Sequence, residues 1–412
     1  MTKRSYTNTL YTNDNLYVLS GLNSESVDLI YLDPPFNSKR MYSAPVGSKA
    51  AGASFKDMWT WKDVDEHYLD SLAVTLPELT RYIASVGKVH SKAMMAYLTY
   101  MSQRIVEMHR ILKETGSLYL HCDPTASHYL KILLDFIFGK NNFRNEIIWC
   151  YRGGGSPKKD FGRRHDSLFR YSKTGDYVFN ADSIRIPYQA EGLGRTDDAM
   201  WGKHKGTDKV YKPNPLGKIP EDWWTMNILN ANDPERTGYP TQKPLALLKR
   251  IVLASSNEGD IVLDPFCGCA TTCVAAQQLN RKWIGIDIEK QATRVLIQRL
   301  SDDAGLFKDF VATDQIPKRS DIKEVLPSES VKQRLYKEQN GKCNACGREF
   351  EIWDFEIDHI IPKAKGGGDY YENYQLLCGS CNRIKGDRPM EYLRLKIETR
   401  ERMMKTTIFF GE

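Results

Sequence analysis

The sequence predicts an α/β fold in which buried strands alternate with helices, followed by a small C-terminal module that a metal ion holds together. Three observations carry this prediction: an apolar run over residues 27–32, a strand–turn–helix–strand pattern over residues 261–288, and two Cys-x-x-Cys pairs after residue 340. The chain has 412 residues, of which 41% are hydrophobic. It is therefore long enough for two or three domains with a proper core.

A proline-rich tetrapeptide, Asp33-Pro34-Pro35-Phe36, follows the apolar run. It suits methyl transfer to the exocyclic amine of a base. That amine is a poor nucleophile, so hydrogen-bond acceptors must draw its nitrogen toward tetrahedral geometry as the new bond forms. Asp33 and the Pro34 carbonyl can accept its two N–H bonds, the prolines stiffen the loop, and Phe36 offers a face for an extruded base. A plain proline turn after a buried strand is the alternative.

A second motif lies far downstream and is typical of a nucleotide-type site. We expect a buried strand, a small-residue turn, a helix and a second strand over residues 261–264, 265–270, 271–279 and 283–288. Gly268 allows a tight turn, and Asp287 lies about 20 residues further on, where an acidic side chain reaches a ribose diol. A dinucleotide is the rival cofactor. Its fingerprint has three glycines where this turn has one, so S-adenosylmethionine, the methyl donor that the tetrapeptide needs, fits better.

These motifs resemble the DNA amino-methyltransferases, in the group whose catalytic motif precedes the cofactor motif. The similarity covers most of the chain before its C-terminal quarter. Thr241-Gln242-Lys243-Pro244 resembles the family's tenth motif, and Asn13-Asp14 resembles the segment beside the adenine of the cofactor. Ala270 stands where the family usually has a second glycine. The resemblance implies a Rossmann-like sheet with an S-adenosylmethionine site formed by Asp14, Thr241, Lys243, Asp264, Phe266, Gly268 and Asp287.

The head of the tetrapeptide bears on the target base. Within the family, Asp at this position usually goes with N6 of adenine and Ser with N4 of cytosine, so Asp33 implies adenine. Cytosine remains the alternative because both amines need the same acceptors. Phe36 replaces the more frequent Tyr without changing the stacking argument. The resemblance thus implies site-specific methylation of double-stranded DNA.

The C-terminal residues carry a separate signature. Two thiol pairs have the spacing of a closed tetrahedral zinc site, formed by Cys343, Cys346, Cys378 and Cys381. A structural zinc ion stabilises a module that is too small for a large apolar core.

Four polar residues accompany the thiol pairs: Asp358-His359, Asn373 and Asn382. This pattern resembles the HNH nucleases, whose fold is ββα. It implies that His359 activates water, that Asp358 and Asn382 hold one magnesium or manganese ion, and that Asn373 holds the loop that orients His359. A zinc ribbon that only binds DNA is the alternative.

These placements predict the domain organisation. We expect a methyltransferase domain over residues 1–314, a polar linker over 315–330 and an HNH domain over 331–412. Residues 150–235 break the strand and helix pattern, and we assign target recognition to them. The alternative is a solvated insertion whose tryptophans pack against the sheet. The basic, aromatic and glycine residues concerned are Gly153-Gly154-Gly155, Lys158-Lys159, Arg163-Arg164-His165, Trp201 and Trp223-Trp224.

Two further groups of side chains stand near the predicted sites. Cys267, Cys269 and Cys273 surround the cofactor turn, and we expect them to pack as small thiols, because a metal cluster there would compete with the cofactor. His121 and Asp123 end a predicted strand, where α/β sheets bind ligands, and both a structural and a catalytic role are open for them.

Composition agrees with these predictions. The net charge of +6 is a mild bias, compatible with DNA but too small to imply it alone. No apolar run approaches the ~20 residues of a membrane helix, and the N-terminus lacks the apolar core of a signal peptide. We therefore expect no membrane partner and a cytoplasmic protein of a prokaryotic or phage-infected cell, where reducing conditions keep thiolates available for zinc. A homodimer is compatible with the sequence, which does not determine the oligomeric state.

Three biological interpretations follow. In the first, both sites act on related sequences, as in a restriction and modification system in one chain. In the second, only the methyltransferase is active and the zinc module adds DNA affinity. In the third, the chain is a mobile-element nuclease with a protective methylase.

Overall fold

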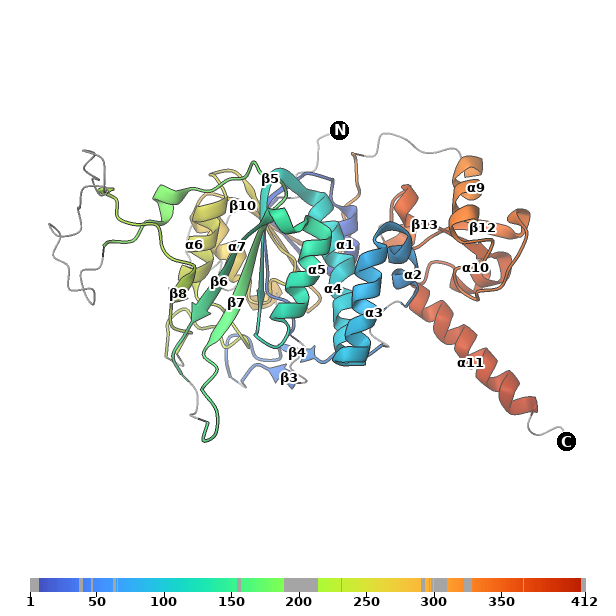
Figure 1. Ribbon diagram of the computed structural model, residues 1–412, viewed down its shortest axis with the longest axis horizontal. Coiled ribbons are helices and arrows are strands. Elements are labelled where there is room, and N and C mark those ends of the chain that lie inside the picture. The colour runs from blue at the N-terminus through green and yellow to red at the C-terminus, as the bar shows by residue number, and fades with distance from the viewer. Residues whose placement is uncertain are drawn as a thin grey trace, which may run out of the picture.

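The computed structural model contains a large α/β domain and a small C-terminal module (Figure 1). Parts of the predicted recognition segment and linker, namely Gly154-Gly155, Trp201 and residues 322–327, lie outside the described residues. The structure describes residues 7–36, 40–45, 47–61, 64, 66–153, 157–188, 214–230, 232–289, 293–295, 297, 299, 310–321, 328–365 and 367–408.

A nine-stranded sheet forms the centre of the large domain. Its strands, in spatial order, are β11 (Val311–Thr313), β1 (Thr9–Thr12), β10 (Lys282–Asp287), β9 (Ile261–Asp264), β2 (Val27–Leu32), β5 (Leu112–Cys122), β7 (His165–Ser172), β6 (Phe143–Cys150) and β8 (Trp223–Thr225). From β11 to β5 every neighbouring pair is parallel. The carboxyl ends of β1, β10, β9, β2 and β5 therefore meet along one side of the sheet, which we call the carboxyl edge. The predicted strands over residues 27–32 and 261–264 are β2 and β9, with the same bounds.

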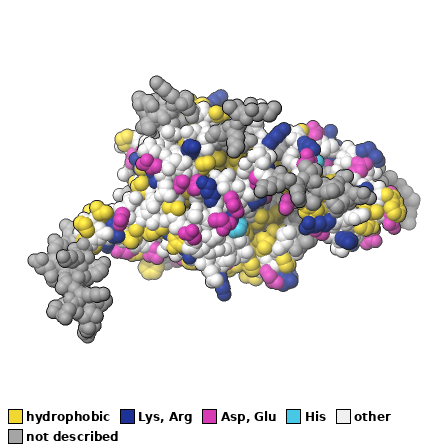
Figure 2. All heavy atoms as spheres, turned by 90° about the horizontal axis from the view of Figure 1, so that it is seen from above, with side chains coloured by type: hydrophobic (Ala, Val, Ile, Leu, Met, Phe, Trp, Pro, Cys, Tyr) yellow, Lys and Arg dark blue, Asp and Glu magenta, His cyan; other side chains and the backbone are white. Residues whose placement is uncertain are grey.

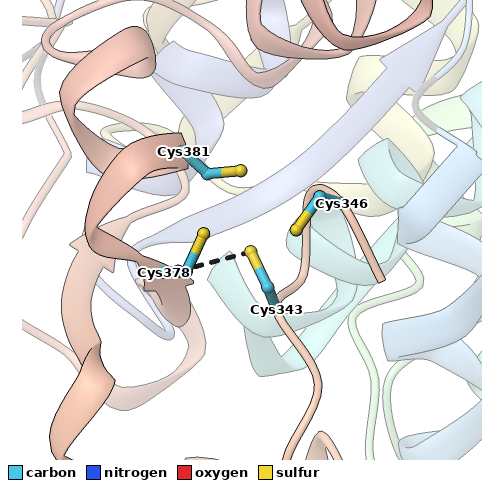
Figure 3. Close-up of side chains that lie close together, drawn as sticks. All are labelled: Cys343, Cys346, Cys378 and Cys381. Atoms are coloured by element: carbon cyan, nitrogen blue, oxygen red, sulfur yellow. Dashed lines mark hydrogen bonds between the residues drawn. The ribbon is translucent and has the colours of Figure 1, made fainter. Parts of the chain in front are cut away.

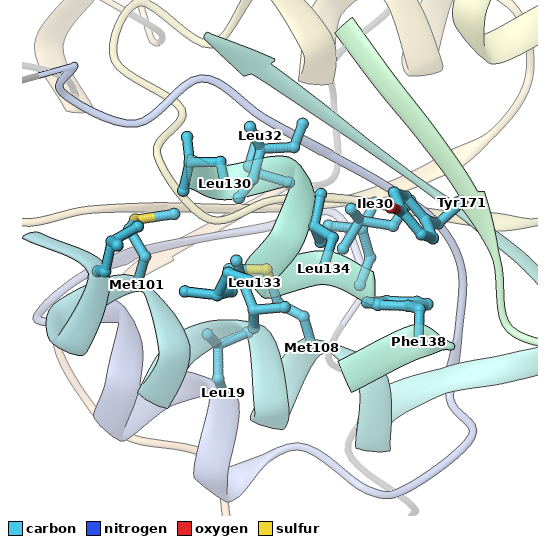
Figure 4. Packing of buried hydrophobic residues seen from close by; sticks show 14 of the residues in the cluster. Leu19, Ile30, Leu32, Met101, Met108, Leu130, Leu133, Leu134, Phe138 and Tyr171 are labelled. Carbon is cyan, nitrogen blue, oxygen red and sulfur yellow. The ribbon is translucent and has the colours of Figure 1, made fainter. Parts of the chain in front are cut away.

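Helices cover both faces of this sheet. They are α1 (Asn15–Gly21), α4 (Lys92–Ile111) and α5 (Ser127–Phe138) on one face, and α6 (Leu245–Ser255) and α7 (Thr271–Gln278) on the other. Successive side chains of a strand point to opposite faces, so Ile30 and Leu32 pack in the first apolar cluster (Figure 4), whereas Leu29 and Tyr31 pack in the second. All six residues of β2 are buried, which explains why five of them are apolar or aromatic, and the sixth, Asp28, pairs with Lys113.

An insertion joins β2 to α4. It consists of a hairpin of β3 (Arg40–Ser43) and β4 (Ser54–Asp57), followed by α2 (Glu66–Thr75) and α3 (Pro77–Val89). The sequence predicts a helical insertion near residues 65–90, and α2 and α3 lie there, whereas the hairpin of β3 and β4 was not predicted. α4 then begins after Ser91, whose hydroxyl accepts the N–H of Met94 as an N-cap.

The segment assigned to target recognition contains part of the sheet. β7 lies between β5 and β6 and is antiparallel to both, and the side chains from Ser167 to Ser172 are buried. Trp224 is buried and packs in the cluster of α6 and α7, whereas Trp223 is 59% exposed. Residues 165–172 and Trp224 therefore belong to the core. β6 ends and β7 begins at the carboxyl edge, because β6 runs parallel to β5 and β7 runs antiparallel to it, so the described residues 151–153 and 157–164 lie between them there.

The C-terminal module has the expected ββα arrangement. Its elements are α9 (Ser328–Glu338), η5 (Ile352–Asp354), β12 (Phe355–His359), η6 (Lys363–Lys365), η7 (Tyr371–Asn373), β13 (Tyr374–Cys378), α10 (Gly379–Lys385) and α11 (Met390–Ile408). β12 and β13 pair antiparallel. The described start of the predicted linker lies against the large domain: Asp321 accepts the N–H of Ser24, and Arg319 lies 4.9 Å from the ring centre of Tyr370 in the module.

The surface mixes charges of both signs. On the face seen in Figure 2, basic and acidic side chains are interspersed, as the small net charge of +6 leads one to expect. Within the part of the chain that the structure describes, no helix combines the length and the apolar character needed to cross a membrane.

Candidate active site and zinc centre

A cavity of about 360 Å³ opens at the carboxyl edge of the sheet. This volume is within the range of small-molecule sites. The cavity brings together every residue predicted for methyl transfer and cofactor binding in the large domain: Asp14, Asp33, Pro34, Pro35, Phe36, Thr241, Lys243, Asp264, Phe266, Gly268 and Asp287. These residues come from five distant parts of the sequence. Parallel pairing of β1, β10, β9 and β2 makes the ends of these strands neighbours, and Thr241 and Lys243 come from the segment before α6.

One oxygen of the Asp33 carboxylate has a hydrogen-bond partner, and the other has none among the described residues. Its Oδ2 accepts from Lys243 Nζ at 2.5 Å, and both side chains are largely buried. Its Oδ1 is buried without a hydrogen-bond partner among the described residues. A buried polar atom left unpaired costs roughly 1–3 kcal/mol, so such atoms in native proteins mark strain or a ligand position. A donor group of a ligand would satisfy Oδ1.

Phe36 and Lys243 line the cavity together with Asp33. Lys243 Nζ is 5.5 Å from the centre of the Phe36 ring. The Phe36 ring also stacks on His121, with ring centres 6.1 Å apart and planes at 28°. His121 is fully buried and does not line the cavity. Asp123 accepts the N–H groups of Thr125 and Ala126 in the turn before α5, which is a structural role.

The cofactor turn is fixed by two buried carboxylates. Asp264 accepts from Thr272 Oγ1 at 2.5 Å and from the N–H of Phe266, while Asp287 accepts the N–H of Gly268 at 2.8 Å. Burial raises the pKa of Asp264 to about 7 and the pKa of Asp287 to about 6. Both carboxyls therefore titrate close to neutral pH, where a cationic ligand would favour their charged form.

Backbone conformation explains two small residues of this turn. Gly268 has φ +50°, and a Cβ atom there would lie 2.9 Å from the Tyr239 ring, so a side chain cannot fit. Ala270, where the related family usually has glycine, also adopts a left-handed conformation, with φ +57°. Cys267, Cys269 and Cys273 are buried, and burial raises the pKa of each thiol. They pack around the turn as small thiols, in agreement with the prediction.

Several residues of the site carry no motif and were missed by sequence reasoning. Arg104 is buried in α4, where it donates to Asn15 Oδ1 at 2.6 Å and to Asp14 Oδ1 at 2.8 Å. Asn15 in turn donates to the carbonyl of Pro265 in the cofactor turn. The available signal was an arginine within the amphipathic stretch over residues 94–112. The insertion and other segments also contribute Tyr31, Tyr42, Asp57, Trp59, Tyr100 and Tyr239 to the cavity.

The cavity lining is strongly acidic. Of the described residues that line it, Lys243 is the single basic one, against the acidic side chains of Asp14, Asp33, Asp57, Asp264, Asp287 and Glu289. The Nε1 atom of Trp59 is buried without a hydrogen-bond partner among the described residues. The cavity thus offers an open acceptor at Asp33, an open donor at Trp59, and an environment that favours a cationic ligand.

The four predicted zinc ligands converge in the C-terminal module (Figure 3). Their sulfur atoms all lie within 4.8 Å of one another, and tetrahedral zinc with Zn–S bonds of about 2.3 Å needs sulfur separations of about 3.8 Å. The pKa of the Cys343 thiol lies below its ordinary value, because the thiol of Cys381 and several backbone N–H groups donate to its sulfur. The cluster can bind zinc.

The predicted nuclease residues lie close to this cluster but are differently engaged. His359 Nε2 is 2.8 Å from Asp369 Oδ1, and Asn373 holds the intervening loop by accepting the N–H of Ile361. Among the described residues, the four cysteines are the one group of three or more His, Cys, Asp and Glu side chains that could hold a metal.

Both predicted ligands of the catalytic ion contact other side chains, Asp358 through its oxygens and Asn382 through its amide nitrogen. The carboxylate of Asp358 receives the ammonium group of Lys385 and the amide of Gln375, so a divalent ion would have to displace Lys385. Asn382 donates to Glu356. Ion binding by Asp358 and Asn382 stays a prediction.

Comparisons with known proteins agree with the two sites. Residues 27–298 match the N6/N4 DNA methylase family, and residues 343–388 match the HNH endonuclease family. The chain is 33% identical over 250 residues to the type II methyltransferase M.BglII of Bacillus subtilis, which covers 58% of this chain and 66% of that relative. It is 28% identical over 327 residues to the DNA adenine methyltransferase YhdJ of Escherichia coli (strain K12), covering 77% and 93%.

Among solved structures, the cytosine-N4-specific PvuII DNA methyltransferase aligns with 74% of this chain and 95% of its own, at 14% identity and a TM-score of 0.46. The family match spans well over half of the chain and contains Asp33, Gly268 and Asp287. The chain therefore belongs to the N6/N4 family of DNA methylases and carries a C-terminal HNH domain.

Proposed function

We propose that this chain transfers a methyl group from S-adenosylmethionine to N6 of adenine in double-stranded DNA, and that its HNH module cleaves DNA with magnesium or manganese. The state of Asp33 carries the first part. One of its oxygens is bound by Lys243, while the other is buried without a partner among the described residues, in a cavity shared with Phe36 and the cofactor turn. An exocyclic amine supplies the donor that this oxygen lacks.

The cavity residues divide the work of the reaction. Asp33 Oδ1 and the Pro34 carbonyl accept the two N–H bonds of the amine, which turns its lone pair out of the ring system. Phe36 holds the extruded base by stacking. When bound, the cofactor supplies an electrophilic methyl group on a positively charged sulfur. As the C–N bond forms and the C–S bond breaks, the amine nitrogen loses a proton, and Asp33 is placed to accept it.

The charge of the cavity supports S-adenosylmethionine over a dinucleotide. The cofactor carries a sulfonium and an ammonium group, which six acidic lining residues favour. A dinucleotide brings two phosphates, and the lining has one basic residue to meet them. We assign the ribose diol to Asp287, which lines the cavity, and close approach of the backbone to the cofactor to Gly268.

The loop over residues 151–164 supports DNA approaching from the carboxyl edge. It joins β6 to β7 at this edge and carries Lys158, Lys159 and Arg163, all of them exposed, together with Phe161, which is 98% exposed. Basic and aromatic side chains on a loop at the same sheet edge as the cavity suit phosphate contact and base extrusion. We assign DNA positioning to this loop.

Adenine is preferred over cytosine on two grounds. The tetrapeptide begins with Asp33, and the relative YhdJ is named a DNA adenine methyltransferase. Modified-base analysis of DNA treated with the protein and S-adenosylmethionine tests this choice. We expect N6-methyladenine at one recurrent sequence. Detection of N4-methylcytosine would mean that the same mechanism acts on cytosine. Unmodified DNA would refute the proposal.

The nuclease proposal rests on His359. Its Nε2 faces the carboxylate of Asp369, which only accepts hydrogen bonds, so in the neutral ring Nδ1 is left as the basic nitrogen that can activate water. Asn373 holds the adjoining loop. We assign the divalent ion to Asp358 and Asn382. Binding of the ion requires that Lys385 first leaves the carboxylate of Asp358.

Cleavage of plasmid DNA tests this assignment against a zinc module that only binds DNA. Wild-type protein with magnesium or manganese should cut unmethylated plasmid, and His359→Ala should not, while zinc content and methylation remain unchanged. Plasmid methylated beforehand by the same protein tests the biological role, because protection of this plasmid from cleavage would support a self-protecting restriction system. If wild-type protein cuts neither unmethylated, methylated nor single-stranded DNA, the module is a binding domain.

A further inference from the structure

His121 lies directly behind the residue proposed to stack the target base. It is fully buried on β5, and its ring faces that of Phe36 with centres 6.1 Å apart and planes at 28°. The ring of Trp149 meets it edge-on, with centres 5.5 Å apart and planes at 86°. Because His121 does not line the cavity, it touches neither the base nor the cofactor, and any effect on the reaction must pass through Phe36 or Tyr31.

Both ring nitrogens of His121 are engaged. Nδ1 is 2.8 Å from the hydroxyl of Tyr31, and Nε2 is 3.1 Å from Asp166 Oδ2. Asp166 also accepts from the hydroxyl of Tyr151 through its other oxygen. The partners come from β2 and β7, the two strands that flank β5 in the sheet. A ring bonded at opposite ends to two neighbouring strands cannot tilt without breaking a buried hydrogen bond, so its plane is fixed.

We propose that His121 is a positioning residue for methyl transfer, which fixes the plane of the Phe36 ring. Pro34 and Pro35 restrain the backbone of the loop, but the Phe36 ring still turns about its own side-chain bonds. With one face resting on His121, the other face is presented to the base at a constant angle. This inference rests on the stacking role proposed above for Phe36.

The reaction is sensitive to that angle. The amine has to meet Asp33 Oδ1 and point its lone pair at the methyl group at the same time. A misplacement of about 1 Å can cost about 10²-fold in rate. An aliphatic side chain at position 121 would fill the volume, yet it would leave Tyr31 and Asp166 without their shared partner and remove the flat surface beneath Phe36.

A double-mutant cycle tests the proposal. Single-turnover transfer of tritiated methyl groups to unmodified genomic DNA, at saturating DNA and S-adenosylmethionine, is measured for wild-type protein, Phe36→Ala, His121→Leu and the double variant. We expect each single variant to be slower by about 10- to 10²-fold, and the double variant to be no slower than Phe36→Ala, because His121 acts through the ring that is missing. Cofactor affinity, measured by calorimetry, should change by less than about twofold in all variants.

Two further variants keep the test open if His121→Leu does not fold. Tyr31→Phe removes one of the two bonds at constant ring volume, and combined with Phe36→Ala it should show the same lack of additivity. Asp166→Asn keeps an acceptor for Nε2 and should stay close to the wild-type rate. The positioning role would be refuted, with the stacking role intact, by either of two results. In the first, the rate losses of the single variants multiply in the double variants. In the second, His121→Leu reacts at the wild-type rate while Phe36→Ala is slow. An unaffected Phe36→Ala would instead refute the proposed stacking role, and this inference with it.

Discussion

The methyltransferase cavity and the HNH module differ in how their central carboxylates are held. At Asp33 one oxygen is bound by Lys243 and the other is buried without a partner among the described residues. At Asp358 both oxygens have partners, from Lys385 and Gln375. Asp33 therefore has one oxygen open to a donor, whereas both oxygens of the nuclease carboxylate already accept hydrogen bonds. The first site is ready to bind, and the second has to exchange a partner before it can hold an ion.

Zinc removal should separate the two regions most strongly. In small zinc modules the free energy of metal binding, about 10–16 kcal/mol, is largely folding free energy. We expect a strong chelator to unfold residues 331–408 while methyl transfer persists, since the cavity lies in a domain with its own apolar clusters. Circular dichroism and limited proteolysis, with methylation measured in the same sample, follow the outcome. Protein that contains no zinc when purified without chelator would contradict the assignment.

The buried pair of Lys385 and Asp358 should show the next largest effect. The Lys385 side chain is fully buried and also donates to the carbonyl of His359 at 2.9 Å. Removing one partner of a buried ion pair costs about 3–5 kcal/mol, because the remaining charge is left unpaired. We expect Lys385→Met to destabilise the module by this amount.

Denaturant unfolding measures this destabilisation, with Lys385→Met/Asp358→Leu as the matched control. That double variant should recover much of the loss. An equal loss of unfolding free energy in the single and the double variant would mean that Lys385 and Asp358 do not stabilise the module as a pair. The contrast between the paired Asp358 and the partly unpaired Asp33 would then have no energetic meaning.

Asp287→Ala should have a smaller effect, confined to the cofactor. Removal of a hydrogen-bond partner of this kind costs about 1–3 kcal/mol, so S-adenosylmethionine should bind about 5- to 150-fold more weakly. DNA binding should stay unchanged. Calorimetry with the cofactor and a DNA gel-shift assay give the two numbers. Binding of a nicotinamide dinucleotide in place of S-adenosylmethionine would leave the fold intact and refute the function.

The pH dependence of cofactor binding should be the smallest effect. Burial raises the pKa of Asp287 to about 6 and that of Asp264 to about 7, so both bind more protons in the folded than in the unfolded protein between pH 4 and pH 7. Stability from these groups therefore falls as pH rises through that window. A cationic cofactor favours the charged forms, so its affinity should rise from pH 5.5 to pH 7.5 by up to about tenfold per unit. Asp287→Asn should flatten the rise, and an affinity that falls with pH would contradict the assignment.

Local motifs were readable from the sequence, and long-range partners were not. Asp33, Gly268 and Asp287 could be predicted because each stands at the end of a buried run, and parallel strands bring such ends together. The contacts of Lys243 with Asp33 and of Arg104 with Asp14 join residues 210 and 90 positions apart, and no spacing rule reports them. The same holds for Lys385, which stands 27 positions from Asp358.

β7 shows a second limit of the sequence. Its residues were placed in a recognition insertion because the glycine-rich and basic loop before them breaks the strand pattern. The chain returns from that loop antiparallel into the sheet, between β5 and β6, and six consecutive side chains become buried. The spatial order of strands in a sheet depends on which strands pair with each other, and a single sequence does not show this pairing. DNA contact by the loop itself stays a prediction.

Methyl transfer by Asp33→Ala tests the central claim most directly, with Asp123→Asn as the matched control at the end of the neighbouring strand. Asp123 is bonded to its own turn and does not line the cavity. We expect Asp33→Ala to lose about 10²-fold or more of the single-turnover rate on unmodified DNA, with S-adenosylmethionine affinity nearly unchanged, and Asp123→Asn to keep both. Near-normal methyl incorporation by Asp33→Ala would contradict the claim that the open oxygen of Asp33 receives the target amine.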